Sequence, residues 1–169
     1  LIGGDGSDTA SYSTSGSAVS INLLFSTFSG GDADGDTLTS IENIIGSKFA
    51  DLIIGDSKKN TLTGNGGNDT IDGGGGSDTV VFNGNVADYN FSLNSTTGSI
   101  QILDSDSTRD GSDAVIKIES FKFNDQTYSL SDVLAQTSFD ILDYIASHSD
   151  LISTFGINTS AAFDHYVSN

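Results

Sequence analysis

The sequence contains no cysteine, proline, methionine or tryptophan, and only six of its 169 residues are lysine or arginine. Without cysteine there is no disulfide, zinc–thiolate site or redox motif. No apolar run approaches the roughly 18 residues of a membrane-spanning helix, so we expect no membrane insertion. The formal charge of −17 excludes nucleic acid as a partner, because the phosphate backbone would be repelled.

What the sequence does contain is 20 glycines and 23 acidic residues. Aspartate is the commonest acid, and it occurs beside glycine and asparagine. Loops of this composition offer the carboxylate and carbonyl oxygens that bind a hard cation such as Ca²⁺. A solvated acidic surface explains the charge equally well, so the spacing of these residues has to decide between the two.

Four consecutive nine-residue units begin at Gly46 and follow one rule. Each starts with glycine, has Asp or Asn in sixth place and has an aliphatic residue in eighth place. The units read GSKFADLII, GDSKKNTLT, GNGGNDTID and GGGGSDTVV, and an earlier copy, GGDGSDTAS, starts at Gly3. A flexible glycine-rich linker has no reason to keep these intervals.

The spacing predicts a mainly β fold. The first six residues of a unit form a turn, and the last three form a short strand whose eighth-position side chain points inward. Two units then close one coil, and stacked coils form two parallel sheets around a narrow aliphatic core. The carboxylates and carbonyls of stacked turns converge, where a cation would offset their charge.

The units resemble the RTX (repeats-in-toxin) nonapeptide GGxGxDxUx, most closely over residues 64–81. The resemblance implies a parallel β-roll that binds Ca²⁺ between turns two units apart, pairing 46–51 with 64–69 and 55–60 with 73–78. Lys58 and Lys59 depart from the motif, so we expect the second pair to be the weaker site. The ligands implied are the side chains of Asp51, Asn60, Asp69 and Asp78 and the backbone carbonyls of Gly46, Gly64, Gly66, Gly73 and Gly75.

The stretch before the repeats, GGDADGDTLTSIENII, is acidic but is no EF-hand, because Thr37 takes the glycine position and Asn43 the final glutamate position. It resembles the irregular opening coils of RTX proteins. Asp8, Asp32 and Asp36 are therefore further calcium candidates, with a solvated turn as the alternative. We interpret the acidic segment 104–113 as a turn first and as a calcium site second.

Two domains are expected. Residues 1–130 would form the roll, with its opening coils and a β-rich cap made by the strand-like segments after Val81. Residues 131–169 have helical spacing, with N-caps at Ser138 and Ser149, and resemble a helical module found beside RTX blocks. We expect the parent protein to continue upstream of Leu1, and the helical module to be truncated at Asn169.

No catalytic motif is present, since the sequence has two histidines and neither an HExxH nor a GxSxG segment. The resemblance implies export through a type I secretion channel and folding on extracellular calcium. Two parent proteins are consistent with this. One is a surface-layer, filament or adhesin protein whose helical module docks a protein partner or supports self-assembly. The other is a secreted protease, lipase or polysaccharide-modifying enzyme with this segment as its non-catalytic tail.

Overall fold

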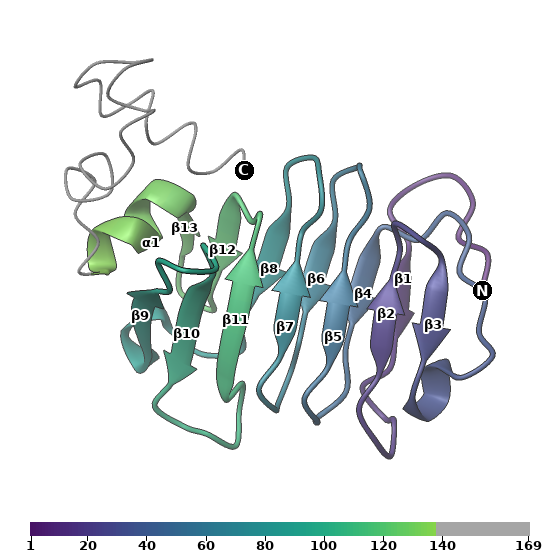
Figure 1. The fold of residues 1–169 in the computed structure, drawn as a ribbon, viewed down its shortest axis with the longest axis horizontal. Coiled ribbons are helices and arrows are strands. Elements are labelled where there is room, and N and C mark those ends of the chain that lie inside the picture. Colours follow the sequence, from purple (N-terminus) through teal and green to yellow (C-terminus); the bar gives the residue numbers. More distant parts are fainter. Residues whose placement is uncertain (138–169) are drawn as a thin grey trace.

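The structure, a computed structural model, describes residues 1–137, which form two facing sheets (Figure 1). The six-stranded sheet has the order β1 (Thr9–Ser11), β4 (Asn43–Ile45), β6 (Thr61–Thr63), β8 (Thr79–Val81), β12 (Ser120–Lys122) and β13 (Thr127–Ser129). The seven-stranded sheet has the order β3 (Thr27–Ser29), β2 (Ser20–Asn22), β5 (Leu52–Ile54), β7 (Thr70–Asp72), β11 (Ser112–Ile116), β10 (Ile100–Asp104) and β9 (Tyr89–Leu93). The helical elements are two 3₁₀ turns, η1 (Gly31–Ala33) and η2 (Val86–Asp88), and the helix α1 (Leu130–Gln136).

Successive nonapeptides place their strands in opposite sheets. From β4 to β8 the strands alternate between the two sheets, so two units complete one coil. β4, β6 and β8 pair in parallel, and so do β5 and β7. This confirms the expected parallel β-roll. The sheets as a whole are mixed, because β3, β13 and the β9–β10 pair run antiparallel to their neighbours at the ends.

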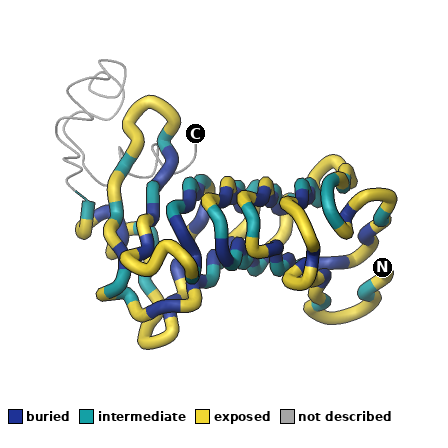
Figure 2. Tube along the Cα trace, turned by 90° about the horizontal axis from the view of Figure 1, so that it is seen from below, coloured by how far each residue is buried: buried dark blue, intermediate teal, exposed yellow. Residues whose placement is uncertain are grey.

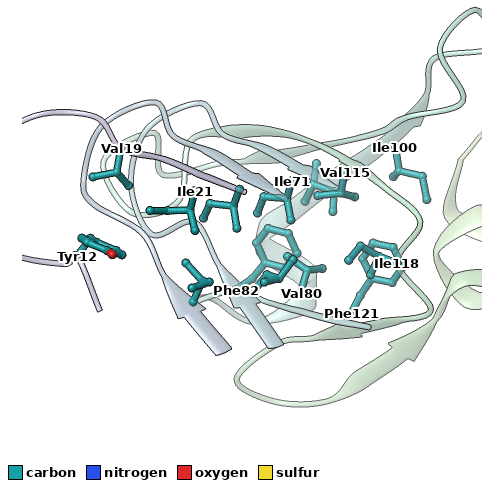
Figure 3. Packing of buried hydrophobic residues seen from close by; sticks show 14 of the residues in the cluster. Tyr12, Val19, Ile21, Ile71, Val80, Phe82, Ile100, Val115, Ile118 and Phe121 are labelled. Carbon is teal, nitrogen blue, oxygen red and sulfur yellow. The ribbon is translucent and has the colours of Figure 1, made fainter. Parts of the chain in front are cut away.

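The centre of the core consists of inward side chains from the paired strands of the two sheets. In a three-residue strand only the middle side chain faces the opposite sheet. The strand register aligns these residues in two rows that face each other, each member at most 4% exposed (Figure 3). The rows are Ala10, Ile44, Leu62, Val80 and Phe121 from one sheet, and Ile21, Ile53, Ile71, Val115 and Ile100 from the other.

The C-terminal end of the roll is closed by the cap that the sequence predicts. Phe123 lies at its centre, and its ring centroid is 5.1 Å from that of Tyr89 and 5.3 Å from that of Phe82. Helix α1 packs on β9, β12 and β13 and buries Val133 and Leu134. The cap covers apolar side chains that the last coil would otherwise leave exposed to water.

Burial is continuous along the roll, whereas the longest exposed loops lie at its two ends (Figure 2). Within residues 1–137 no helix has both the length and the apolar character to cross a membrane. The helices predicted to begin at Ser138 and Ser149 lie outside the described residues, as does most of the predicted helical module.

Candidate calcium-binding turns

Parallel stacking lines up the sixth-position residues in two columns, one before each sheet. The Asp51 column leads into the seven-stranded sheet, and the Asp78 column leads into the six-stranded sheet. The Asp51 column consists of Val19, Asp51, Asp69 and Asp113. The Asp78 column consists of Asp8, Glu42, Asn60, Asp78 and Glu119.

In the Asp51 column each carboxylate accepts a hydrogen bond from the backbone of the preceding coil. Val19 N donates to Asp51 Oδ1, Asp51 N to Asp69 Oδ1 and Asp69 N to Asp113 Oδ1, each at 2.8 Å. All three aspartates are at most 3% exposed. Three successive coils therefore each add one buried carboxylate directly beside the next.

The Asp78 column follows the same rule with one interruption. Asp78 N donates to Glu119 Oε2 at 2.6 Å, and Asn60 N donates to Asp78 Oδ1 at 2.7 Å. At Asn60 the side chain is a neutral amide, whose Nδ2 donates to the Glu42 carbonyl at 3.0 Å and whose Oδ1 accepts from Asp56 N at 2.8 Å. The amide therefore has protein partners on both of its atoms.

Two buried carboxylate oxygens in the repeats have no partner. Asp69 and Asp78 each use Oδ1 in the column, but neither Oδ2 has a hydrogen-bond partner, although both residues are only 1% exposed. Burial, together with the charge of nearby acids, raises the pKa of Asp69 to about 7 and that of Asp78 to about 6. Burial likewise raises the pKa of Asp113 to about 8. The ionised forms are costly here because no positive charge compensates them.

The first glycine of each unit is required by close approach. A Cβ at Gly46 would lie 2.5 Å from Asp51 Oδ2 and 2.7 Å from the Gly64 carbonyl oxygen. A Cβ at Gly55 would collide with the Gly73 carbonyl, and one at Gly73 would lie 2.7 Å from Asp78 Oδ2. The carboxylate of one turn and a carbonyl of the next therefore approach the same point, which any larger residue would fill.

The third-position glycines also lie between stacked turns. A Cβ at Gly66 would be 3.1 Å from the Arg109 carbonyl oxygen and 3.7 Å from that of Lys48. Gly75 N donates to the Asp56 carbonyl at 2.8 Å. Lys58 and Lys59 lie exposed in the Gly55 turn.

The opening candidates do not all join the columns. Asp8 does, and its Oδ2 has no hydrogen-bond partner. Asp32 is exposed on η1, and Asp36 accepts a hydrogen bond from the Tyr12 hydroxyl at 2.8 Å. Neither Asp32 nor Asp36 occupies a sixth position.

Sequence reasoning missed Glu42, Asp113 and Glu119 as column members. Each stands two residues before an inward apolar side chain, Ile44, Val115 or Phe121. That spacing is the signal that could have identified them, since it equals the interval from the sixth to the eighth position of a repeat.

The chemistry of the donor set fits calcium. Within residues 1–137 no three carboxylate or imidazole side chains converge closely enough to bind a metal ion by themselves. The oxygens that do converge are one or two carboxylates and the backbone carbonyls of stacked turns. Ca²⁺ accepts such mixed oxygen sets with flexible geometry, whereas Mg²⁺ demands a nearly ideal octahedron.

Comparison with known proteins identifies the repeats. No curated protein matches the chain. Residues 45–80 match the family model of the RTX calcium-binding nonapeptide repeat, in four copies. These are the units whose strands β5 to β8 build the centre of the roll. Residues 45–80 are therefore a block of RTX repeats, a non-catalytic element that binds Ca²⁺.

Proposed function

We propose that this chain is a calcium-folded segment of a secreted or cell-surface protein. The observation that carries the proposal is the pair of buried oxygens without hydrogen-bond partners, Asp69 Oδ2 and Asp78 Oδ2, in stacked turns. A buried, uncompensated carboxylate opposes folding. A divalent cation between the turns reverses that cost, because it supplies the charge that the protein lacks there.

The proposed ligands are those expected from the sequence. They are the side chains of Asp51, Asn60, Asp69 and Asp78 and the carbonyls of Gly46, Gly64, Gly66, Gly73 and Gly75. The position of Asp8 in a column supports its inclusion. The contacts of Asp32 and Asp36 give no such support.

The proposed mechanism couples calcium to folding. Where calcium is scarce, inside the cell, the carboxylates repel one another and the chain stays loose enough for export. Extracellular calcium modules commonly have dissociation constants of about 10⁻⁴–10⁻³ M, so the ion binds outside the cell. Its binding free energy then becomes folding free energy, because the unfolded chain has no preformed site. RTX repeats are typical of secreted proteins, which supports this order of events.

The parent protein that we favour is structural or adhesive. A short roll closed by a cap supports a spacer that presents other modules. In this proposal residues 1–130 form the roll domain and residues 131–169 form a helical module that docks a partner. Helix α1 straddles that boundary and packs on the cap. Calcium-induced assembly into ordered arrays would support this parent. An HExxH or GxSxG motif elsewhere in the parent would instead identify a secreted enzyme with a non-catalytic tail.

A calcium titration of the full chain, followed by far-UV circular dichroism, tests the proposal. We expect β signal to appear cooperatively near millimolar calcium and to disappear when EDTA is added. Size-exclusion chromatography at both end points distinguishes folding from assembly. A chain that is fully folded in EDTA and unchanged by calcium would contradict the proposal.

A matched pair of variants makes the test specific. Asp69→Asn removes one buried charge but keeps an acceptor for Asp51 N. Asp125→Asn removes one exposed charge and keeps an acceptor for Val86 N. The first variant should need more calcium to fold, and the second should fold like the wild type.

A further inference from the structure

The acidic turn at residues 104–113 takes the place of the next repeat turn, although its sequence is not a nonapeptide. β11 pairs in parallel with β7 and aligns Val115 with Ile71, which puts Asp113 in a sixth position. Three hydrogen bonds join this turn to the last regular turn of the column. Asp69 N donates to Asp113 Oδ1 at 2.8 Å, Ala114 N to the Asp69 carbonyl at 2.8 Å and Ser112 N to Asn68 Oδ1 at 3.0 Å.

Backbone carbonyls of the coils before and after Gly66 gather at this residue. A Cβ there would lie 3.1 Å from the Arg109 carbonyl oxygen and 3.7 Å from each of those of Thr108 and Lys48. Lys48 belongs to the coil before the Gly64–Asp69 turn, and the irregular turn belongs to the coil after it. Carbonyl oxygens therefore approach this turn from both neighbouring coils. Gly111, with φ +82°, lets the chain pass against the Gly67 carbonyl without a side chain in between.

Asp69 and Asp113 are consecutive buried carboxylates of the Asp51 column at this gap. Asp69 is 1% exposed and Asp113 is 2% exposed, and Asp69 Oδ2 has no hydrogen-bond partner. That oxygen lies beside the position that a Cβ of Gly64 would take. In the regular turn before it, the same position at Gly46 lies 2.5 Å from Asp51 Oδ2 and 2.7 Å from the Gly64 carbonyl oxygen of the next coil. Asp69 Oδ2 is therefore directed toward the irregular turn.

The arginine of the irregular turn is already engaged elsewhere. Arg109 forms a bidentate pair with Asp104, at 2.7 and 2.6 Å, and its Nη1 lies 3.2 Å from Asp88. Asp110 is satisfied separately by Asn83 and by the Tyr89 hydroxyl. In residues 1–137 no lysine or arginine forms an ion pair with Asp69 or Asp113.

We propose a further calcium site outside the matched repeats, between the Gly64–Asp69 turn and the turn of residues 108–113. Its carboxylate ligands are Asp69 and Asp113, and its remaining ligands are backbone carbonyl oxygens of the two turns. Two carboxylates balance the charge of one Ca²⁺, and carbonyls complete the six to eight oxygens that the ion prefers. The proposal rests on the proposed function, because it extends the same column by one coil. It makes the calcium-bound roll continuous with its cap.

Anomalous diffraction from crystals of the full chain grown in calcium tests the site without any mutation. We expect an anomalous peak within about 2.3–2.6 Å of both carboxylates. Peaks between the regular turns but none between Asp69 and Asp113 would overturn this inference alone. No calcium peak anywhere in the roll would overturn the proposed function as well.

Native mass spectrometry of variants gives the corresponding test in solution. Asp113→Asn should bind one calcium fewer than the wild type, because asparagine keeps the acceptor for Asp69 N but loses the charge. The control Asp125→Asn should bind the wild-type number. An unchanged number of bound ions in Asp113→Asn would contradict the site, whereas a reduced number in both variants would point to a general effect of charge and contradict it too.

Discussion

The Asp51 and Asp78 columns obey the same spacing rule but handle buried charge differently. In the Asp51 column, three aspartates follow one another in successive coils with no neutral residue between them. In the Asp78 column, Asn60 separates Glu42 from Asp78 and donates its amide hydrogen to the Glu42 carbonyl. The neutral Asn60 amide, hydrogen-bonded within the protein, thus stands where an aspartate would add a further buried charge.

This difference shows how the folding of one roll can depend on calcium more strongly in one column than in the other. A neutral amide with both atoms paired costs little to bury, whereas a row of carboxylates accumulates repulsion and desolvation. We therefore expect the Asp51 column to need calcium more than the Asp78 column does. The hydrophobic rows behind the two columns are equally buried, so the contrast should lie in the turns alone.

The largest effect should come from the core and should be the same on both sides. Ile71→Ala and Leu62→Ala each remove a side chain that is at most 1% exposed. In saturating calcium each should lower the free energy of unfolding by about 2–5 kcal/mol, measured by urea denaturation. Thr70→Ser, at an exposed position, is the control. A loss in only one of the two core variants would show that the sheets do not share a single core.

The next largest effect should come from removing one buried charge in each column, and the two columns should respond differently. Asp69→Asn should raise the calcium concentration at the folding midpoint about tenfold, equivalent to about 1.4 kcal/mol. Asp78→Asn should raise it less, because the neutral Asn60 already precedes Asp78. Calcium titrations followed by circular dichroism give both midpoints. An equal or larger shift for Asp78→Asn would mean that the columns do not differ in the way proposed.

Acidity should substitute in part for calcium. The pKa values of about 6, 7 and 8 for Asp78, Asp69 and Asp113 lie above the ordinary 3.8, so the folded chain binds protons that the unfolded chain has lost. The stabilisation from each group is complete below pH 3.8. It declines by up to about 1.4 kcal/mol per pH unit as the pH rises from there to the folded pKa of that group, and all of it is lost once the pH has risen through the highest of these values, about 8.

In EDTA, the chain should therefore show more β signal by circular dichroism at pH 5 than at pH 8. Saturating calcium should remove this trend, since the ion takes the place of the protons. A calcium-free chain that gains β signal on going from pH 5 to pH 8 would contradict the assigned burial of these carboxylates.

The smallest effect should come from making the two columns alike. Asn60→Asp replaces the hydrogen bond to the Glu42 carbonyl with a further buried charge. At a calcium concentration near the wild-type folding midpoint, the free energy of unfolding at pH 7.5 should fall by about 1 kcal/mol, and saturating calcium should restore it. Urea unfolding at the two calcium concentrations measures both values. If calcium restores nothing, the Asp78 column lacks the carbonyl ligands that a site at this position would need.

The sequence by itself determined the roll and the first set of candidate ligands. Glycine in first place, Asp or Asn in sixth and an aliphatic residue in eighth recur within nine residues, so the information is local. A turn that excludes side chains and a strand with one inward residue follow from that spacing. The expected ligands Asp51, Asp69 and Asp78 fall in the columns for this reason.

Only the tertiary structure decided how far the columns extend. The hairpin of β9 and β10 separates β8 from β11 along the chain, and the pairing of β11 with β7 is what brings Asp113 beside Asp69. Glu119 joins the other column through the pairing of β12 with β8. Asp32 and Asp36, which the sequence offers as further calcium candidates with a solvated turn as the alternative, stay outside both columns. Strand register between distant segments depends on packing against the common core, and no local spacing encodes it.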